Sequence, residues 1–476
     1  MSAHHRPLAV DLDGTLLQTD LLHESVLRLL KNQPFLIFAL PFWLLSGKAA
    51  FKRRLAAAVE LDVSTLPFNI PFLEWLKHQR SQGRRLILCT ASDSMLANAI
   101  AQNLGIFDAV LASDGKTNLS GANKAAALIS AFGSKQFDYA GNATIDLPVW
   151  KVAHHAIVVS NSKALQAQAK RLTKVELIFE QSTDFITAVI QSLRLHQWIK
   201  NALLFVPLLA AHHTDNPDAW STLFLAFIAF SLCASAVYII NDLLDLESDR
   251  NHVRKCLRPF AAGDLPIPLG IAMVPTLLLL SFGIASYIGT AFLICLFIYC
   301  AMTCAYSWRL KQWVLVECLT LAILYTLRII AGAAAVAVPL SFWLLAFSIF
   351  LFFSLAFIKR YAELEIQDLS GIRKVHGRGY FTSDAPLIQQ LGVSSGYIAV
   401  LILALYLNSE NVVRLYKTPQ IIWAAIPLML LWLSWMWLKA HRGLMHDDPI
   451  VFAIKDKVSL LIGLLFVLTF ILATWW

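Results

Sequence analysis

The sequence predicts an N-terminal α/β domain with a Rossmann-like parallel sheet, followed by an all-α membrane domain of about nine spanning helices. As far as residue 185, short apolar runs alternate with helical patterns, which is typical of a mostly parallel sheet. From about Ser192 the apolar runs lengthen towards the ~20 residues that cross a bilayer. Only 15% of residues are charged, against about a quarter in soluble domains, so much of the surface faces lipid. We therefore expect one domain over residues 1–185 and another over residues 186–476.

The short apolar runs of the first domain predict its strands. The clearest are residues 8–10, 86–89 and 156–159. A longer apolar segment, residues 34–45, contains two prolines and is too short to span a bilayer. Two interpretations stay open for this segment: a buried helix, or an element that touches the membrane.

The second domain is expected to cross the bilayer about nine times. The predicted spans are residues 200–213, 220–240, 267–285, 287–306, 314–335, 340–358, 391–408, 420–438 and 458–475. Basic residues concentrate in alternate loops, for example Arg250, Arg254, Lys255 and Arg258. By the positive-inside rule, these loops and the α/β domain face the cytoplasm, which predicts a multi-pass protein of the inner membrane.

The charge distribution argues against a nucleic-acid-binding protein, and the cysteine spacing argues against a zinc protein. The formal net charge of +8 comes from basic residues between apolar spans, where they orient the protein and contact headgroups or phosphates. We therefore expect no binding of nucleic acid. The seven cysteines show no zinc-ligand spacing with histidines and are expected to be small buried hydrophobic residues.

Two carboxylates directly follow the first predicted strand. Asp11 and Asp13 lie two residues apart, which suits phosphoryl transfer. One carboxylate can attack phosphorus while the other manages the proton, and a magnesium ion between them screens their repulsion. Gly14 lets the backbone approach a phosphate closely.

Three further groups follow at later points of the first domain. Thr90 ends a strand with a hydroxyl for a phosphate oxygen, and Lys124 lies at a helix start, where it can neutralise nucleophile and phosphate. Asn142 and Asp146 follow another strand. Open α/β sheets bind ligands at the carboxyl ends of their strands, so we expect these groups to form one site with the two aspartates.

With these motifs, residues 6–180 resemble the haloacid dehalogenase (HAD) superfamily, near its phosphoserine-phosphatase-like branch. The resemblance implies a helical cap over residues 16–85, Asp11 as nucleophile and Asp13 as general acid/base. It implies phosphate contacts from Thr90 and Lys124, and a magnesium site that includes Asp11, Asp13, Asn142 and Asp146. Asn142 stands where the family usually has an acidic residue, and its amide oxygen ligates magnesium with less charge.

An acidic stripe ends the second predicted span. Asp242, Asp245 and Asp249 are spaced i, i+3 and i+7, so one helix would present three carboxylates on one face, and Asn241 joins them at i+4 to Asp245. Like charges gathered at a membrane edge are costly unless a divalent cation neutralises them. Magnesium that bridges these carboxylates to a diphosphate meets this need. The basic residues that follow can contact the diphosphate from its other side: His252, Lys255 and Arg258.

Polar residues also lie within or at the ends of other spans. Arg328 lies inside the fifth span, about three helical turns after Glu317 on the same face. An intramembrane arginine indicates a functional site, unless it forms a structural pair with Glu317. Lys200, Lys359 and Arg360 lie at span ends, where they either bind substrate or serve as interfacial anchors.

The second domain resembles the UbiA superfamily of intramembrane prenyltransferases across nearly all of residues 192–476. The most specific match is NDxxDxxxD at residues 241–249, followed by HxxKxxRPxAxG at residues 252–263. The second region of the superfamily matches less strictly, and Glu317 departs from the aspartate expected there. The substrate contacts that the resemblance implies in this region are Tyr306, Lys311, Glu317, Tyr325 and Arg328.

Residues 325–332, 359–364 and 379–384 most resemble the decaprenyl-phosphate phosphoribosyltransferase branch of that superfamily. This branch implies transfer of ribose 5-phosphate from phosphoribosyl pyrophosphate (PRPP) to a polyprenyl phosphate, with Mg²⁺ as cofactor. The fused HAD-like domain would then remove the 5-phosphate. Two alternatives stay open: a prenyl diphosphate donor with a small acceptor and a HAD-like domain that acts on a separate substrate, or a HAD-like domain that serves as a regulatory module. The last basic loop, which carries residues 445–449 and then Lys455 and Asp456, is a candidate lid over the membrane site.

Overall fold

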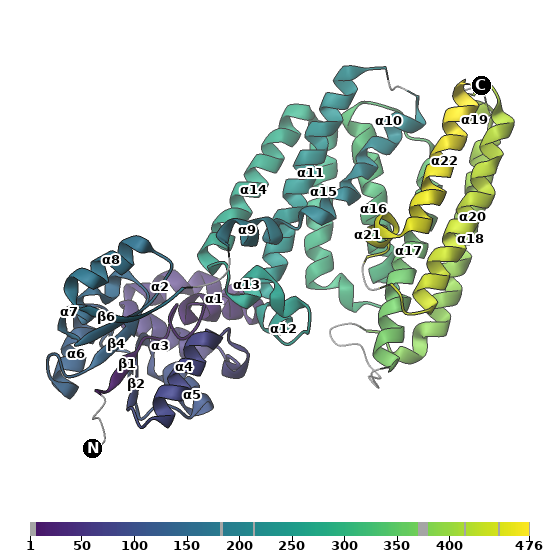
Figure 1. Ribbon diagram of the computed structural model, residues 1–476. Coiled ribbons are helices and arrows are strands. Elements are labelled where there is room, and N and C mark those ends of the chain that lie inside the picture. The colour runs from purple at the N-terminus through teal and green to yellow at the C-terminus, as the bar shows by residue number, and fades with distance from the viewer. Residues whose placement is uncertain are drawn as a thin grey trace. The chain divides into compact units, whose positions relative to one another are not determined.

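The computed structural model describes residues 6–180, 184–212, 215–369, 379–413, 416–445 and 448–475. The chain forms two compact units (Figure 1). The first comprises Met1–Leu193 and Tyr238–Met273, and the second comprises Arg194–Val237 and Val274–Trp476. The loop with the acidic stripe and the basic residues after it therefore belongs to the first unit.

A six-stranded parallel sheet lies at the centre of the HAD-like part of the first unit. Its strand order is β3-β2-β1-β4-β5-β6. The strands are β1 (Leu8–Val10), β2 (Leu86–Asp93), β3 (Ala109–Ser113), β4 (Asp138–Gly141), β5 (His155–Val159) and β6 (Lys174–Phe179). Every residue of β1 is buried, because the strand is covered on both faces. The predicted parallel α/β sheet is confirmed.

Helices cover both faces of this sheet. They are α4 (Ile70–Ser81), α5 (Ser94–Leu104), α6 (Ala122–Phe132), α7 (Leu147–Val152) and α8 (Lys163–Leu172), with α9 (Phe185–Leu193) after the last strand. Side chains alternate along each strand, so Leu8 and Val10 pack into one core while Ala9 packs into the other. This two-sided burial fixes where each strand ends and thus where the polar residues after it lie.

The cap is helical, as predicted, but it ends before the predicted residue 85, because α4 packs Phe72 and Leu76 against the strands of the sheet. It contains α1 (Leu21–Asn32), η1 (Pro34–Ala39), α2 (Leu40–Leu45), α3 (Lys48–Ala58) and η2 (Val63–Thr65). The interpretation of Pro34–Leu45 as a buried helix is wrong, because Phe35, Phe38 and Phe42 are 84%, 74% and 70% exposed. The two prolines divide this segment into two six-residue pieces, which are too short to present one continuous packing face. Membrane contact by this segment stays a prediction.

Eight helices in the described part of the chain are long and apolar enough to cross a membrane. They are α11 (Pro217–Leu244), α14 (Ile267–Ile288), α15 (Thr290–Trp308), α16 (Val316–Ala335), α17 (Phe342–Leu369), α18 (Ala385–Leu407), α20 (Ala425–His441) and α22 (Lys457–Trp475). The prediction of about nine spans is close to these eight, and the difference lies at residues 200–213, which do not form one long helix. This stretch instead forms η4 (Leu195–Phe205) and the short α10 (Val206–Ala210), and it buries the polar side chains of Lys200 and Asn201 against other elements.

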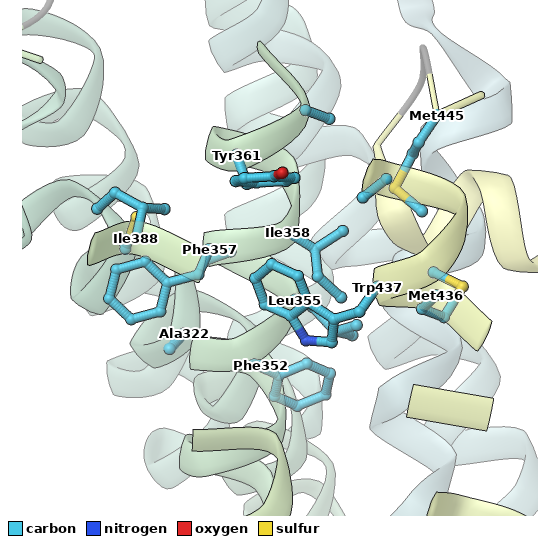
Figure 2. Packing of buried hydrophobic residues seen from close by; sticks show 14 of the residues in the cluster. Ala322, Phe352, Leu355, Phe357, Ile358, Tyr361, Ile388, Met436, Trp437 and Met445 are labelled. Atoms are coloured by element: carbon cyan, nitrogen blue, oxygen red, sulfur yellow. The ribbon is translucent and has the colours of Figure 1, made fainter. Parts of the chain in front are cut away.

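The main core of the second unit joins α16, α17, α18 and α20. Figure 2 shows Leu355, Phe357 and Ile358 of α17 gathered near Trp437 of α20. Tyr325 and Tyr361 belong to the same cluster, so polar residues of α16 and α17 are held by close apolar packing.

Candidate active sites

The HAD-like part brings four of the predicted polar groups together at the ends of β1, β2 and β4. Lys124 of α6 lies with its Nζ 2.8 Å from Asp11 Oδ1 and donates to the hydroxyl of Tyr139 at 2.9 Å. That hydroxyl in turn donates to Asp146 Oδ1 at 2.8 Å. The sequence analysis did not single out Tyr139. Tyr139 lies on β4, three residues before the predicted site residue Asn142. This closeness in the sequence is the signal that could have identified it.

Asp13 connects the sheet to the first cap helix. Its carboxylate accepts hydrogen bonds from Ser92 Oγ at 2.6 Å and from the backbone N–H of Leu21 at 2.9 Å. Thr90 Oγ1 accepts from the Ser92 N–H at 3.0 Å, so the end of β2 folds towards Asp13. The sequence analysis did not single out Ser92, and the structure gives it a direct contact with the second carboxylate.

The turn after β4 depends on Asp146. Its Oδ2 atom accepts hydrogen bonds from the N–H groups of Asn142 and Ala143, each at 3.1 Å. The Asn142 amide oxygen accepts from Thr15 Oγ1 at 3.2 Å. Gly14 has a φ of +73°, and a Cβ atom there would lie 2.1 Å from Asn142 Nδ2, so glycine is required where the two loops meet.

Burial and like charge dominate the electrostatics of this site. Burial raises the pKa of Asp11 to about 7, although Lys124 partly offsets this, and burial also raises the pKa of Asp13 to about 6. Burial alone would lower the pKa of Lys124, but the carboxylates of Asp11 and Asp146 hold it above its ordinary value. A divalent cation would relieve the repulsion between the two buried aspartates. Asp11, Asp13 and Asn142 offer the oxygen donors that Mg²⁺ prefers.

A second group of possible metal ligands lies at the opposite ends of the strands. Asp138 begins β4, and His154 and His155 precede or begin β5. The Asp138 carboxylate is already paired with the buried guanidinium of Arg84 and accepts from the His155 N–H at 2.8 Å. This group therefore ties β4 to its neighbours and is separate from the site at Asp11.

The acidic stripe is divided between two helices. α11 ends at Leu244 and α12 (Leu246–Arg250) begins after Asp245, whose φ of −105° and ψ of 15° leave the helical region. The prediction of one continuous helix is therefore wrong at Asp245. Asp242 and Asp249 still converge, because Arg258 Nη1 lies 3.1 Å from Asp242 Oδ1 and 2.6 Å from Asp249 Oδ2. Both carboxylates are buried.

The basic residues after the stripe adopt different positions. Arg258 directly precedes α13 (Pro259–Ala262). From this position the Arg258 side chain contacts Asp242 and Asp249. Lys255 is exposed in η5 (Lys255–Leu257), and His252 Nδ1 accepts from the Arg254 N–H at 3.2 Å. Asn241 is half-buried near the end of α11. The structure therefore brings two of the three predicted carboxylates together beside Arg258, whereas Asp245 pairs with Lys31.

Within the first unit, the cap helix α1 forms ion pairs with α12. Arg250 donates two hydrogen bonds to Glu24, of which the shorter is 2.6 Å, and both side chains are buried. Lys31 Nζ lies 3.0 Å from Asp245 Oδ1, and Arg28 pairs with Glu247. Sequence reasoning did not predict these contacts, because they join residues more than two hundred positions apart.

In the second unit, Lys200 and Lys359 meet at one carboxylate. Lys200 Nζ lies 2.8 Å from Asp448 Oδ2 and Lys359 Nζ lies 3.4 Å from it, while the Tyr325 hydroxyl is 3.2 Å from Oδ1. Lys200 is only 8% exposed, so its interpretation as an interfacial anchor is wrong. Asp448 was part of the candidate lid and had no assigned role. His446 and Asp447 of that loop lie outside the described residues.

Arg328 and Glu317 do not form the pair that the sequence allowed. The Arg328 guanidinium donates to Asn201 Oδ1, to the Leu324 carbonyl and to the Tyr299 hydroxyl, at 2.9, 2.7 and 2.9 Å. Glu317 pairs instead with Arg360, because α16 and α17 pack side by side.

The remaining predicted contacts surround Glu317. Tyr306 donates to Glu317 Oε1 at 3.2 Å, and Arg360, which is fully buried, also pairs with Glu363. Lys311 is half-buried in η6 (Leu310–Gln312), the short connection between α15 and α16. The structure therefore separates two polar groups in this unit, one around Glu317 and one around Asp448.

Comparisons with known proteins match both parts of the chain. Residues 202–476 match the model of the UbiA prenyltransferase family, and residues 8–148 match the model of haloacid dehalogenase-like hydrolases. An uncharacterized protein of Sinorhizobium fredii is 36% identical over 470 residues, which cover 98% of this chain and 91% of that protein. Nodulation protein NoeC of Azorhizobium caulinodans is 34% identical over 284 residues, which cover 59% of this chain and 92% of that protein. Decaprenyl-phosphate phosphoribosyltransferase of Mycobacterium tuberculosis is 35% identical over 205 residues, which cover 42% of this chain and 68% of that protein.

Proposed function

Because this chain belongs to the UbiA prenyltransferase family and carries a HAD-like domain, we propose that it is a bifunctional enzyme of polyprenyl-phosphoryl ribose synthesis. Its membrane domain transfers ribose 5-phosphate from PRPP to a polyprenyl phosphate, and its HAD-like domain removes the 5-phosphate from the lipid product. The observation that carries the proposal is the convergence of Asp242 and Asp249 on Arg258. The similarity to decaprenyl-phosphate phosphoribosyltransferase supports the choice of substrates.

In the transferase reaction, a phosphate oxygen of the lipid attacks C1 of the ribose. The bond between C1 and the diphosphate oxygen breaks, and diphosphate leaves. Asp242, Asp245 and Asp249 would hold magnesium, which supplies positive charge against the leaving diphosphate. Arg258, with Lys255 and His252 from the same loop, contacts the diphosphate oxygens and orients C1 towards the acceptor.

In the phosphatase reaction, Asp11 attacks the phosphorus of the 5-phosphate, and the ribose oxygen leaves. Asp13, two residues after the nucleophile and held by Ser92 and the Leu21 N–H, gives this oxygen a proton. Lys124, held by Asp11 and Tyr139, balances the charge of the phosphoryl group. Water then hydrolyses the phosphoryl–Asp11 bond, with Asp13 as the base. Asp11, Asp13 and Asn142 would hold magnesium here, with Asp146 keeping the Asn142 turn in place.

In this proposal both sites face the cytoplasm, as the positive-inside rule predicts from the basic residues in alternate loops. The lipid product would then reach the HAD-like domain without crossing the bilayer. This shared side explains why fusion of the two domains benefits the reaction sequence.

One experiment tests both activities. Purified protein is incubated with Mg²⁺, PRPP labelled in the ribose and a polyprenyl phosphate, and the lipid fraction is analysed. We expect a labelled lipid without 5-phosphate from the unmodified protein and a 5-phosphorylated lipid from Asp11→Asn. Asp242→Asn should abolish the labelled lipid but leave hydrolysis of a soluble phosphate ester unchanged. The absence of labelled lipid, together with turnover of a prenyl diphosphate and a small acceptor, would overturn the proposal in favour of ordinary prenyl transfer.

A further inference from the structure

A buried basic cluster in the second unit holds one carboxylate between two lysines. Lys200 and Lys359 both contact Oδ2 of Asp448, and the hydroxyl of Tyr325 contacts its other oxygen. The Asp448 side chain is 11% exposed and that of Lys200 is 9% exposed. The Lys359 side chain is 30% exposed. Two ammonium groups therefore share a single negative charge at a site that is buried at Lys200 and half-buried at Lys359.

A third cation extends this cluster. The Arg328 guanidinium lies over the rings of Tyr299 and Tyr325, at 4.8 and 5.3 Å from their centroids, and donates to uncharged oxygens. The other nearby carboxylates, Glu317 and Glu363, pair with Arg360. Among the described residues, the three positive charges of Lys200, Lys359 and Arg328 thus face the single negative charge of Asp448. Such an excess is costly to bury unless an anion joins it.

A phosphate monoester matches the cluster better than a carboxylate does. It carries a charge of about −1.5 to −2 at pH 7 and three strong acceptor oxygens, whereas Asp448 offers one charge and two oxygens. The ammonium groups of Lys200 and Lys359 and the hydroxyl of Tyr325 can donate to phosphate oxygens in the same way as they donate to Asp448.

The composition of the cluster also indicates which substrate it suits. A diphosphate bound through magnesium needs several carboxylates, and the acidic stripe at Asp242 provides them. The cluster at Asp448 has three cations and one carboxylate, so it suits a phosphate that binds without metal. Lys359 and Tyr325 lie on α17 and α16, two of the helices that are long and apolar enough to span the membrane, as a site for the headgroup of a lipid requires.

We propose that Lys200, Lys359 and Tyr325 bind the phosphate of the polyprenyl phosphate acceptor, and that Asp448 occupies this site until the phosphate replaces it. This inference rests on the proposed transferase function. Asp448 lies immediately before the seven-residue α21 (Pro449–Lys455) and accepts from the Ile450 N–H at 3.3 Å. Its side chain can therefore turn away without the unwinding of a spanning helix.

The test is a binding titration of the full-length protein in detergent with farnesyl monophosphate, without PRPP and without Mg²⁺. Farnesol and inorganic phosphate are titrated in parallel, because they separate the contributions of the chain and the phosphate. Asp448→Asn removes the competing charge but keeps the cap of α21, since asparagine caps a helix as well as aspartate does. Asp456→Asn is the matched control, because Asp456 contacts Trp435 and Ser459 at the other end of α21.

We expect Asp448→Asn to bind farnesyl monophosphate about tenfold more tightly and Lys200→Met to bind it about tenfold more weakly. Asp456→Asn should match the unmodified protein, and farnesol binding should be unchanged in every variant. Phosphate should also raise the melting temperature of Asp448→Asn more than that of the unmodified protein, because it replaces the lost counter-charge. If Lys200→Met does not fold, Lys359→Met provides the same comparison.

Equal or weaker binding of farnesyl monophosphate by Asp448→Asn would overturn the proposal, because Asp448 would then orient the lysines rather than compete with the ligand. A gain for inorganic phosphate without a gain for farnesyl monophosphate would assign the site to a free phosphate and also overturn it. The titration contains no donor. A failure of the PRPP assay with this binding result intact would therefore refute the proposed reaction and not the phosphate site.

Discussion

The Arg250 guanidinium donates two hydrogen bonds to Glu24, and this buried pair joins α12, beside the acidic stripe, to the first helix of the HAD cap. Arg250 directly follows Asp249 in the chain, and it also donates to the Ala261 carbonyl at 2.9 Å. Gly263, at the end of the same loop, has a φ of +84°, and a Cβ there would lie 2.6 Å from Gln18 Cβ. The cap thus supports the loop that we assign to the transferase.

This support predicts that a substitution in the cap impairs the transferase. Glu24→Ala leaves Arg250 buried without its charge partner, which typically destabilises a folded unit by about 3 kcal/mol. We expect labelled-lipid formation to fall by about tenfold, as for other losses of supporting contacts around a metal site. Glu60→Ala, at an exposed position of the same cap, is the control and should retain full activity. Unchanged transfer by Glu24→Ala would show that the loop keeps its conformation without the cap.

Tyr139→Phe should slow the phosphatase and spare the transferase. The hydroxyl of Tyr139 is the only atom removed, and it connects Lys124 to Asp146 in the described structure. Without it Lys124 is less well oriented towards Asp11, so we expect kcat for a soluble phosphate ester to fall by about tenfold while KM changes little. Transferase activity of the same preparation serves as the internal control. An equal loss of both activities would indicate a folding defect instead.

Asn142→Asp should lower the magnesium concentration that the phosphatase needs. The change adds a negative charge at the end of β4 and keeps an oxygen that can accept from Thr15. Because carboxylates bind Mg²⁺ more strongly than amides, half-maximal activity should occur at a lower Mg²⁺ concentration. Asn142→Ala, which removes the oxygen altogether, should shift the requirement in the opposite direction. A requirement that is the same in all three proteins would exclude residue 142 from the metal site.

The sequence predicted those features that depend on local pattern. Asp11 and Asn142 could be placed near each other because both follow buried parallel strands, and such strands end at one edge of a sheet. The failures have equally physical causes. The break at Asp245 changes only one residue's backbone angles, and no proline or glycine marks it. Residues 34–45 have the composition of a core helix, yet their prolines divide them into two short pieces that pack only part of their apolar side chains against the cap and leave Phe35, Phe38 and Phe42 exposed.

Partners of buried charges were harder to predict than the charges themselves. Helical spacing placed Glu317 and Arg328 on one face of α16, but the partner of Glu317 comes from α17. The role of Asp448 depends on the meeting of η4, α16, α17 and the start of α21, which no periodicity in the sequence records. The packing of segments that are far apart in the sequence decides which charges pair. Local patterns in a single sequence do not predict that packing.

The pair between Glu317 and Arg360 gives the last prediction, which separates a structural from a substrate-binding role. Both side chains are 0% exposed, so the removal of either charge leaves the other buried without compensation, at a typical cost of about 3–5 kcal/mol. We expect Arg360→Met and Glu317→Met each to lower the melting temperature strongly. The double variant should regain most of the loss, because two well-packed apolar side chains replace the pair at little cost.

The transferase assay then decides the role of the pair. If the pair is structural, the double variant recovers activity together with stability. If Arg360 binds substrate, the double variant is stable but only weakly active, and the KM for one substrate rises in proportion to the loss. The resemblance to UbiA enzymes implies the second outcome, whereas full burial of both groups favours the first. We expect the double variant to recover activity together with stability, because the Arg360 guanidinium already forms ion pairs with both Glu317 and Glu363.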